Sequence, residues 1–170
     1  MKKYKIIFAD LDGTLIDTIS GATFPKGICD MRIKFDVLDK IKEFAPSYLF
    51  IVTNQGGIES GFVNERNFKT KLHYIALSIE EYCGCKVDYA CCTTNDKNNK
   101  YRKPNVGMLE VLCEGHSEEN DFHFDKKHFL MIGDASGKEC QFSDSDKKCA
   151  KNFGIDYMDV DDFVKCSLKE

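Results

Sequence analysis

A short apolar segment that ends in two aspartates constrains this 170-residue chain more than any other feature. Residues 4–18 read YKIIFADLDGTLIDT, and the run Ile6–Ala9 inside them is apolar. Such a run, rich in β-branched and aromatic residues, is typical of a strand buried on both faces of a parallel sheet. Asp10 and Asp12 end the run, and Gly13 breaks it. Because catalytic groups of open α/β sheets lie at the carboxyl ends of the strands, this pair predicts an active site. The alternative is a turn with two solvated acids, since so short a motif also occurs by chance.

Strands and helices alternate along the rest of the chain. Buried strands are predicted at Lys5–Leu11, Leu49–Val52, Val87–Cys92, Phe129–Ile132 and Ile155–Met158. Helices are predicted over Val37–Phe44, Asn64–Tyr82 and Asn105–Cys113, from a cap at Ser143 to Phe153, and over Asp161–Cys166. Residues 14–25 read as a hairpin or flap, and residues 115–127 as a polar loop. The alternation predicts one domain over residues 1–170, an α/β fold with a doubly wound parallel sheet.

Composition and charge limit the classes of function. The formal net charge is −4, so the chain as a whole lacks the basic footprint of many nucleic-acid-binding proteins, although a local patch can serve. No apolar run approaches the roughly 20 residues of a membrane helix, and charges interrupt the amino-terminal run too early for a signal peptide. We therefore expect an intracellular protein, nuclear or cytoplasmic, that is monomeric and has no membrane partner.

The chain contains nine cysteines, an odd number without a secretory signal. Reduced thiols are the expected state in an intracellular compartment. The alternative is a zinc site built from Cys83, Cys85, Cys91 and Cys92, but structural zinc usually requires two spaced pairs of ligands. Cys83 ends a predicted helix and the Cys91–Cys92 pair ends a predicted strand, so we expect these side chains to point apart.

Asp10-x-Asp12-Gly-Thr-Leu behind an apolar strand resembles the nucleophile loop of the haloacid dehalogenase (HAD) superfamily. Further segments over residues 6–163 are similar to the 3′-phosphatase domain of polynucleotide kinase/phosphatase. They are TISG at 18–21, FP at 24–25, DMR at 30–32, IVTNQGGI at 51–58, YRKPNVGM at 101–108, GDASG at 133–137 and FSDSD at 142–146. The resemblance implies a Rossmann-like core that removes phosphate from DNA 3′ ends during strand-break repair, using Mg²⁺.

The resemblance also implies a role for each matched residue. Asp10 would attack phosphorus to form an aspartyl-phosphate, and Asp12 would protonate the leaving alcohol and later deprotonate the attacking water. Mg²⁺ would be held by Asp10, Asp134 and the Asp12 backbone carbonyl, because this ion prefers oxygen ligands. Thr53, Asn54 and Lys103 would bind the phosphate. Asp146 matches a family position near the metal, or it is a first-turn acid that the helix dipole stabilises.

Two features of this chain bear on substrate choice. The spacers Asp17–Thr53 and Gln55–Lys103 are too short to carry an inserted cap domain, so we expect a capless, open site that can accept a polymer end. Lys97, Lys100 and Arg102 precede Lys103 and are candidates for DNA binding; the alternative is a solvated basic loop.

The chain departs from the resembled family at several places. Met31 replaces a tryptophan, and Glu59 begins a stretch that often carries a basic residue. No Gly-x-x-x-x-Gly-Lys-Ser/Thr motif occurs, so we expect no kinase domain. One alternative function is a capless small-molecule phosphatase, of the histidinol-phosphate or heptose-bisphosphate type. Another is a catalytically silent DNA-end-binding module, against which the complete set of site residues argues.

Overall fold

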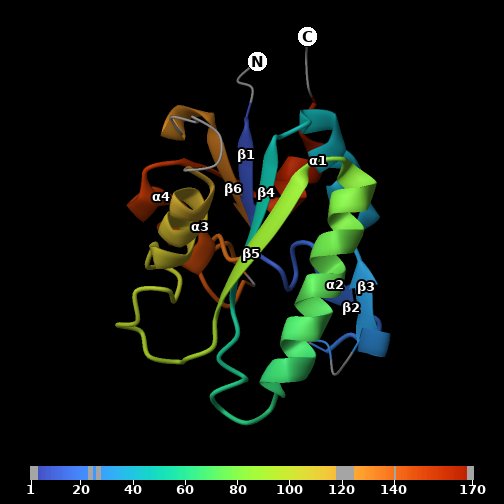
Figure 1. Cartoon of the computed structure of the whole chain (residues 1–170), viewed down its shortest axis with the longest axis vertical. Coiled ribbons are helices and arrows are strands. Elements are labelled where there is room, and N and C mark those ends of the chain that lie inside the picture. Colours follow the sequence, from blue (N-terminus) through green and yellow to red (C-terminus); the bar gives the residue numbers. More distant parts are fainter. Residues whose placement is uncertain (1–3, 23–24, 26–27, 118–124, 140, 168–170) are drawn as a thin grey trace.

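A five-stranded parallel sheet forms the centre of the molecule, in the order β5-β4-β1-β6-β7 (Figure 1). The computed structural model describes residues 4–22, 25, 28–117, 125–139 and 141–167. The strands are β1 (Ile6–Ala9), β4 (Tyr48–Asn54), β5 (Lys86–Cys92), β6 (Phe129–Gly133) and β7 (Asp156–Asp159). Because β1 lies between β4 and β6, the residues that follow these three strands meet at one edge of the sheet.

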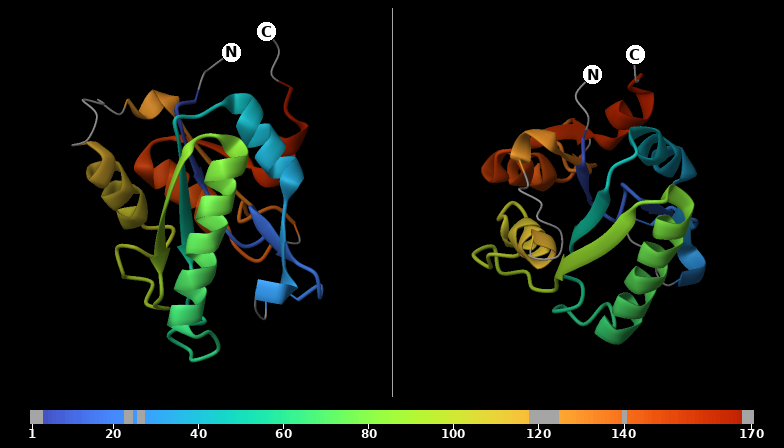
Figure 2. Two further views of the ribbon diagram at one scale, coloured as in Figure 1. Left: turned by 45° about the vertical axis from the view of Figure 1, so that its right-hand side comes forward. Right: turned by 45° about the horizontal axis from the view of Figure 1, so that its top comes forward.

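Helices cover both faces of the sheet (Figures 1 and 2). One layer contains α1 (Phe35–Phe44), α2 (Glu65–Cys83) and α5 (Val160–Lys165); the other contains α3 (Gly107–Ser117) and α4 (Ser145–Phe153). Side chains of a strand alternate between the faces, so Ile7 packs under the first layer while Ile6 and Phe8 pack under the second. The predicted doubly wound α/β fold is confirmed.

A small antiparallel hairpin is the insertion between β1 and α1. Its arms are β2 (Ile16–Thr18) and β3 (Met31–Ile33), and the short 3₁₀ turn Ile28–Asp30 precedes β3. The hairpin predicted over residues 14–25 therefore has its second arm later in the chain than expected; Thr23 and Phe24 lie outside the described residues. Within the described ranges, nothing larger than this hairpin is inserted there.

Several boundaries differ from the predicted ones, each for a local reason. β4 continues through Thr53 and Asn54, which were expected in the following loop. α3 begins at Gly107 instead of Asn105, because the Asn105 carboxamide closes the preceding loop by donating to the Lys97 carbonyl at 3.0 Å.

The remaining differences lie in the second half of the chain. Asp144 occupies the cap position of α4 without a side-chain cap hydrogen bond, whereas the hydroxyl of Ser143, the predicted cap, accepts from the Ser145 amide at the start of the helix. The predicted polar loop 115–127 is partly helical: α3 runs to Ser117 and a 3₁₀ turn spans Lys126–His128, with residues 118–124 outside the described part. No helix within the described ranges is both long and apolar enough to cross a membrane.

Candidate active site

The carboxyl edge of the sheet brings together the polar groups that follow β1, β4 and β6. Asp10 comes directly after β1, and its backbone amide donates to the Ile132 carbonyl of β6 at 3.1 Å. Thr53 is the penultimate residue of β4 and is 1% exposed. Asp134 follows β6 immediately. The strand order thus explains why residues more than a hundred positions apart in the sequence form one site.

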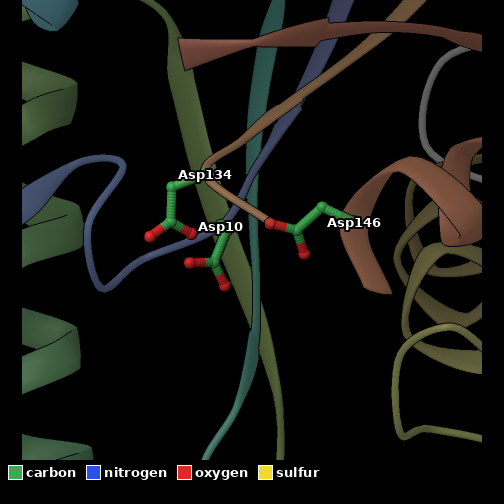
Figure 3. A group of neighbouring side chains, drawn as sticks. All are labelled: Asp10, Asp134 and Asp146. Atoms are coloured by element: carbon green, nitrogen blue, oxygen red, sulfur yellow. The ribbon is translucent and has the colours of Figure 1, made fainter. Parts of the chain in front are cut away.

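Three carboxylates form a cluster at this edge (Figure 3). Asp10, Asp134 and Asp146 each offer one oxygen atom, and these atoms lie within 4.8 Å of one another. Figure 3 shows Asp10 and Asp134 side by side at the strand ends, with Asp146 reaching toward them from α4. Among the described residues no cysteine joins such a group, so the candidate metal site consists of oxygen ligands.

Two glycines allow the carboxylates to approach the backbone this closely. A Cβ atom on Gly13 would lie 2.1 Å from Oδ2 of Asp134, and one on Gly133 would lie 2.2 Å from Oδ2 of Asp146. Gly13 also has a φ of +81°, in the left-handed region that favours glycine. Both glycines are therefore required by the position of the acids beside them.

Lys103 neutralises part of this negative charge from a fully enclosed position. Its ammonium group lies 2.5 Å from Oδ1 of Asp10 and 2.8 Å from Oδ1 of Asp146, and it also donates to the Val52 carbonyl at 2.7 Å. Burial alone would lower the pKa of Lys103, but Asp10 and Asp146 outweigh it and raise that pKa. Lys103 is therefore a permanent cation that touches the proposed nucleophile.

Asn54 fixes the backbone of Lys103. Its Nδ2 donates to the Lys103 carbonyl at 3.0 Å, and its Oδ1 accepts from the Lys103 amide at 2.9 Å. The carboxamide side chain predicted to bind phosphate is thus engaged with a peptide group. The observed contact joins the end of β4 to the loop that delivers the lysine.

The Asp12 side chain is hydrogen-bonded to Gln55, for which the sequence predicted no role. Nε2 of Gln55 donates to Oδ2 of Asp12 at 2.6 Å and to the Thr53 hydroxyl at 2.9 Å. Oδ1 of Asp12 is buried and has no hydrogen-bond partner in the described structure. Burial raises the pKa of Asp12, against the Gln55 hydrogen bond and the charges of Lys71 and Lys103. This carboxyl can therefore carry a proton on an oxygen that no protein group uses. The only signal for Gln55 in the sequence was its place directly after Thr53-Asn54.

Burial and then the charge of Asp146 raise the pKa of Asp134 to about 6, against the charges of Lys103 and Lys34. Lys34, just before α1, donates from its ammonium group to the Gly13 carbonyl at 3.0 Å. The cluster therefore holds more negative charge than its own lysines neutralise.

Lys71 is a basic residue near Asp12 for which the sequence predicted no role. It lies half-buried on α2, and its charge opposes the rise in the pKa of Asp12. Burial lowers the pKa of Lys71, while Asp12 raises it. Its position within a long amphipathic helix gave no sign that it faces the site.

The basic loop predicted to bind DNA lies beside the site but outside the carboxylate cluster. Lys97 and Lys100 are exposed, and the Lys100 ammonium group lies 4.8 Å from the centre of the Tyr101 ring. Arg102 is half-buried, and its Nη1 donates to the Thr94 carbonyl at 2.7 Å. Lys97 and Lys100 therefore present their charges to solvent, whereas Arg102 forms a hydrogen bond within its own loop.

The family model described as "Polynucleotide kinase 3 phosphatase" matches residues 5–164 of the chain. The chain is 29% identical to an "Uncharacterized 20.8 kDa protein" of Autographa californica nuclear polyhedrosis virus, over 98% of this chain and 89% of the relative. It is 32% identical to the "Bifunctional polynucleotide phosphatase/kinase" of Schizosaccharomyces pombe, over 95% of this chain and 38% of that protein.

Other relatives are similar at a comparable level. The "Histidine biosynthesis bifunctional protein HisB" of Legionella pneumophila (strain Lens) is 28% identical, over 92% of this chain and 41% of that protein. The chain thus spans about two fifths of each bifunctional relative. A solved D,D-heptose 1,7-bisphosphate phosphatase from B. bronchiseptica superposes with a TM-score of 0.67 and 19% identity, covering 90% of this chain and 78% of that one. This last likeness is one of fold. The family model matches nearly the whole chain, so the protein belongs to the polynucleotide kinase 3 phosphatase family and is a phosphomonoester hydrolase.

Proposed function

We propose that this protein is a Mg²⁺-dependent polynucleotide 3′-phosphatase that removes the phosphate from DNA 3′ ends through an aspartyl-phosphate, as one step of strand-break repair. The observation that carries the proposal is the carboxylate cluster with Lys103, placed at a sheet edge that the described residues leave without a cap domain. The family match over residues 5–164 supports the choice of substrate. A polymer end can enter an uncapped site, whereas lidded sites suit small molecules.

The residues present fit Mg²⁺. Three carboxylate oxygens lie within 4.8 Å of one another, Lys103 contacts only two of these carboxylates, and oxygen is the ligand type that Mg²⁺ prefers. Asp10, Asp134 and the Asp12 backbone carbonyl would hold the ion. Both oxygens of Asp146 already accept hydrogen bonds, from Lys103 and from the Ala135 amide, so we assign Asp146 to orienting Lys103 and the loop that follows β6. When bound, the ion would neutralise charge on the carboxylates and on the phosphate.

The chain's own residues account for the proton and phosphoryl transfers. A carboxylate oxygen of Asp10 attacks phosphorus, the bond from phosphorus to the 3′ oxygen breaks, and Asp12 gives that oxygen a proton. Asp12 then takes a proton from water, which attacks phosphorus, releases inorganic phosphate and restores the Asp10 carboxylate. Lys103 and the Thr53 hydroxyl stabilise the negative charge on the transferred group.

A small-molecule phosphatase is the second candidate, because relatives named for histidine biosynthesis are nearly as similar as the kinase/phosphatase relative. The structural neighbour, a D,D-heptose 1,7-bisphosphate phosphatase in complex with magnesium and phosphate, points the same way. Those proteins and this chain share the core, so only the substrate separates the two candidates.

A phosphate-release panel tests the proposal. The purified protein is incubated with Mg²⁺ and a 3′-phosphorylated DNA oligonucleotide, its RNA counterpart, histidinol phosphate, a heptose bisphosphate or an aryl phosphate. We expect kcat/KM to be highest for the DNA oligonucleotide. Asp10→Asn is the matched control, because losing the covalent nucleophile while keeping the side-chain volume should remove several orders of magnitude of rate. A preference for a small phosphomonoester would favour the second candidate, and full turnover by Asp10→Asn would overturn the mechanism.

A further inference from the structure

Phe62 is the most exposed large apolar residue of the described chain, at 88% of its full accessible surface. Single exposed apolar residues are common on protein surfaces, so exposure alone proves nothing. The neighbours of Phe62 make the position unusual. Ile58 and Val63 on either side of it pack against the hydrophobic core, and both the Phe62 and Val63 amides donate to the Gly57 carbonyl, at 2.9 and 3.1 Å. Ile58 and Val63 of this loop therefore pack against the core, whereas the Phe62 ring points to solvent.

The loop that carries Phe62 is fastened to the basic loop after β5. Glu59 accepts from the Thr94 hydroxyl at 2.8 Å and from the Asn95 amide at 2.5 Å. Nδ2 of Asn95 donates to the Gly56 carbonyl at 2.9 Å. We call the two loops, residues 55–63 and 93–103, the β4–β5 rim. Figures 1 and 2 show both loops projecting beyond the carboxyl ends of the strands.

Basic residues occur in the two segments that adjoin the loop carrying this ring, the basic loop bonded to it through Glu59 and the helix α2 that follows it. On the basic loop of the rim, Lys97 and Lys100 are exposed. In α2, Arg66 and Lys69 lie exposed on the first turns, next to Glu65. Lys69 is paired with Glu65 at 2.7 Å, whereas Arg66 has no carboxylate partner in the part of the chain that the structure describes.

We propose that Phe62 stacks on an unpaired nucleobase upstream of the scissile 3′-phosphate, and that Arg66 contacts the backbone phosphate beside that base. This inference rests on the proposed function and narrows its substrate to a single-stranded 3′ end. An aromatic face beside cations that track a phosphate backbone is the combination by which proteins hold single strands. In a duplex, the faces of interior bases are already stacked on their neighbours, so they are closed to such a ring. Stacking requires no particular base, hence little sequence preference is expected.

Enzyme variants and substrate variants test the inference together. The variants are Phe62→Ala, Phe62→Tyr and, as a matched loss of an exposed apolar side chain far from the rim, Leu77→Ala on α2. The substrates are a single-stranded 3′-phosphorylated DNA of about 10 nucleotides, a length within the range of single-strand binding sites, a thymidine 3′-monophosphate and an aryl phosphate. Oligonucleotides with one abasic position, moved stepwise from the end, locate the base concerned. Fluorescence anisotropy of the same DNA on an Asp10→Asn background measures binding without turnover.

Phe62→Ala is expected to lower kcat/KM and affinity for the oligonucleotide by roughly 5- to 100-fold, the usual worth of one stacked base. Phe62→Tyr and Leu77→Ala should behave like the unchanged protein, and the mononucleotide and aryl phosphate should be unaffected by all three. One abasic position should cause the same loss in the unchanged protein and no further loss in Phe62→Ala.

Two results would overturn the inference. One is equal affinity and equal kcat/KM of the unchanged protein and Phe62→Ala for the oligonucleotide. The other is an equal loss by Phe62→Ala on all three substrates. An unchanged protein that releases phosphate from small esters but not from the oligonucleotide would instead defeat the proposed function. The anisotropy measurement then still decides whether Phe62 contributes to binding a single strand.

Discussion

For single residues of the site, the contacts of each side chain determine its charge, its position and the role it can take. Lys103 is held at its ammonium end by Asp10 and Asp146 and at its peptide by Asn54, so neither charge nor position is free to vary. Asp12 is held on one oxygen only, by Gln55, which leaves Oδ1 available for a proton. The same contacts that fix these groups therefore separate a permanent cation from a group that gains and loses a proton.

Replacing Asp12 with alanine should slow both chemical steps, because one carboxyl serves both proton transfers. For a DNA 3′-phosphate the expected loss in kcat is roughly 10²- to 10⁴-fold, the usual contribution of a general acid–base group. An aryl phosphate needs no proton on its leaving group, so its first step should be affected less than its second. We therefore expect Asp12→Ala to release one equivalent of the aryl alcohol in a burst, followed by slow turnover, as measured by stopped-flow absorbance. Rates like those of the unchanged protein on both substrates would assign proton transfer to another group.

At the scale of elements, the loop between β6 and α4 determines where two of the three clustered carboxylates lie. It begins at Asp134 and ends at the helix that carries Asp146. The Tyr157 hydroxyl on β7 donates to the Gly133 carbonyl at 3.0 Å, and its oxygen lies 2.5 Å from the Ser136 hydroxyl oxygen. Ser136 in turn donates to Asp159 at 2.5 Å. Burial opposes ionisation of Asp159, but hydrogen bonds from Lys138, Ser136 and Gln141 lower its pKa to about 2.

Removing the Tyr157 hydroxyl should therefore loosen the metal site while leaving the reacting groups in place. We expect Tyr157→Phe to raise the Mg²⁺ concentration for half-maximal activity roughly 10-fold, within the range for losing a group that orients metal ligands, with kcat at saturating Mg²⁺ nearly unchanged. The rise in melting temperature with Mg²⁺ should shift to higher Mg²⁺ concentrations by the same factor. Tyr74→Phe, at an exposed position on α2, is the control. A loss of kcat that saturating Mg²⁺ cannot restore would contradict a role in holding the ligands.

The basic loop after β5 should act on polynucleotides alone. Lys97→Ala combined with Lys100→Ala is expected to raise KM for an oligonucleotide and to reduce the slope of log KM against log salt by about 0.7 for each DNA phosphate that the loop no longer neutralises. Hydrolysis of an aryl phosphate should not change, because it never reaches this loop. Steady-state kinetics over a salt series measure both effects. Unchanged KM and slope for the oligonucleotide would leave the two lysines as part of a solvated surface.

The strands and the positions of the acids could be predicted because each is indicated by a pattern within one short stretch of sequence. Apolar runs marked β1, β4 and β6, and polar groups at their ends marked Asp10 and Asp134. Contacts between segments carry no such signal. The hydrogen bonds between Asn54 and Lys103 join residues 49 positions apart, and the one between Gln55 and Asp12 joins residues 43 positions apart.

Element ends were predicted less well for a related reason. Side chains that close loops compete with helix starts, as the Asn105 carboxamide does before α3. The second arm of the hairpin, β3, is a three-residue strand whose pairing with β2 no local pattern indicates. Strand identity could thus be read from the sequence, whereas contacts between loops required the structure.

At the scale of the whole molecule, the fold concentrates negative charge at one edge of an already acidic chain. The formal net charge is −4, and one carboxylate oxygen from each of Asp10, Asp134 and Asp146 lies within 4.8 Å of the others at the carboxyl ends of the strands. Lys103 contacts two of them and neutralises only part of their charge. Repulsion among these carboxylates should therefore reduce the stability of the metal-free protein at neutral pH.

The stability of the metal-free protein should consequently rise as the pH falls below neutrality. The folded pKa of Asp134, raised to about 6 by burial and by Asp146, lies above its ordinary value of 3.8, so ionising Asp134 costs more in the folded state than in the unfolded state. That cost is present above pH 6 and disappears as the pH falls from about 6 toward 4. Mg²⁺ binds the ionised carboxylates, so its stabilising effect should be large at pH 7.5 and small at pH 5. At about 100 times its dissociation constant, the ion is worth about 2.7 kcal/mol, or roughly 5–10 °C in the melting temperature of a domain of this size.

Thermal unfolding with Mg²⁺ or with a chelator, at pH 5 and at pH 7.5, measures both effects, and Asp134→Asn is the matched control. In that variant the metal-free protein should melt higher at pH 7.5 than the unchanged chain, because one repelling charge is gone. It should also gain little from Mg²⁺, because one of the ligands is gone. An equal rise in melting temperature with Mg²⁺ at both pH values, or an equal rise in Asp134→Asn, would place the stabilising ion away from the carboxylate cluster. The pH dependence of stability therefore reports on the metal site independently of any substrate, which separates the metal prediction from the choice between a polynucleotide and a small phosphate ester.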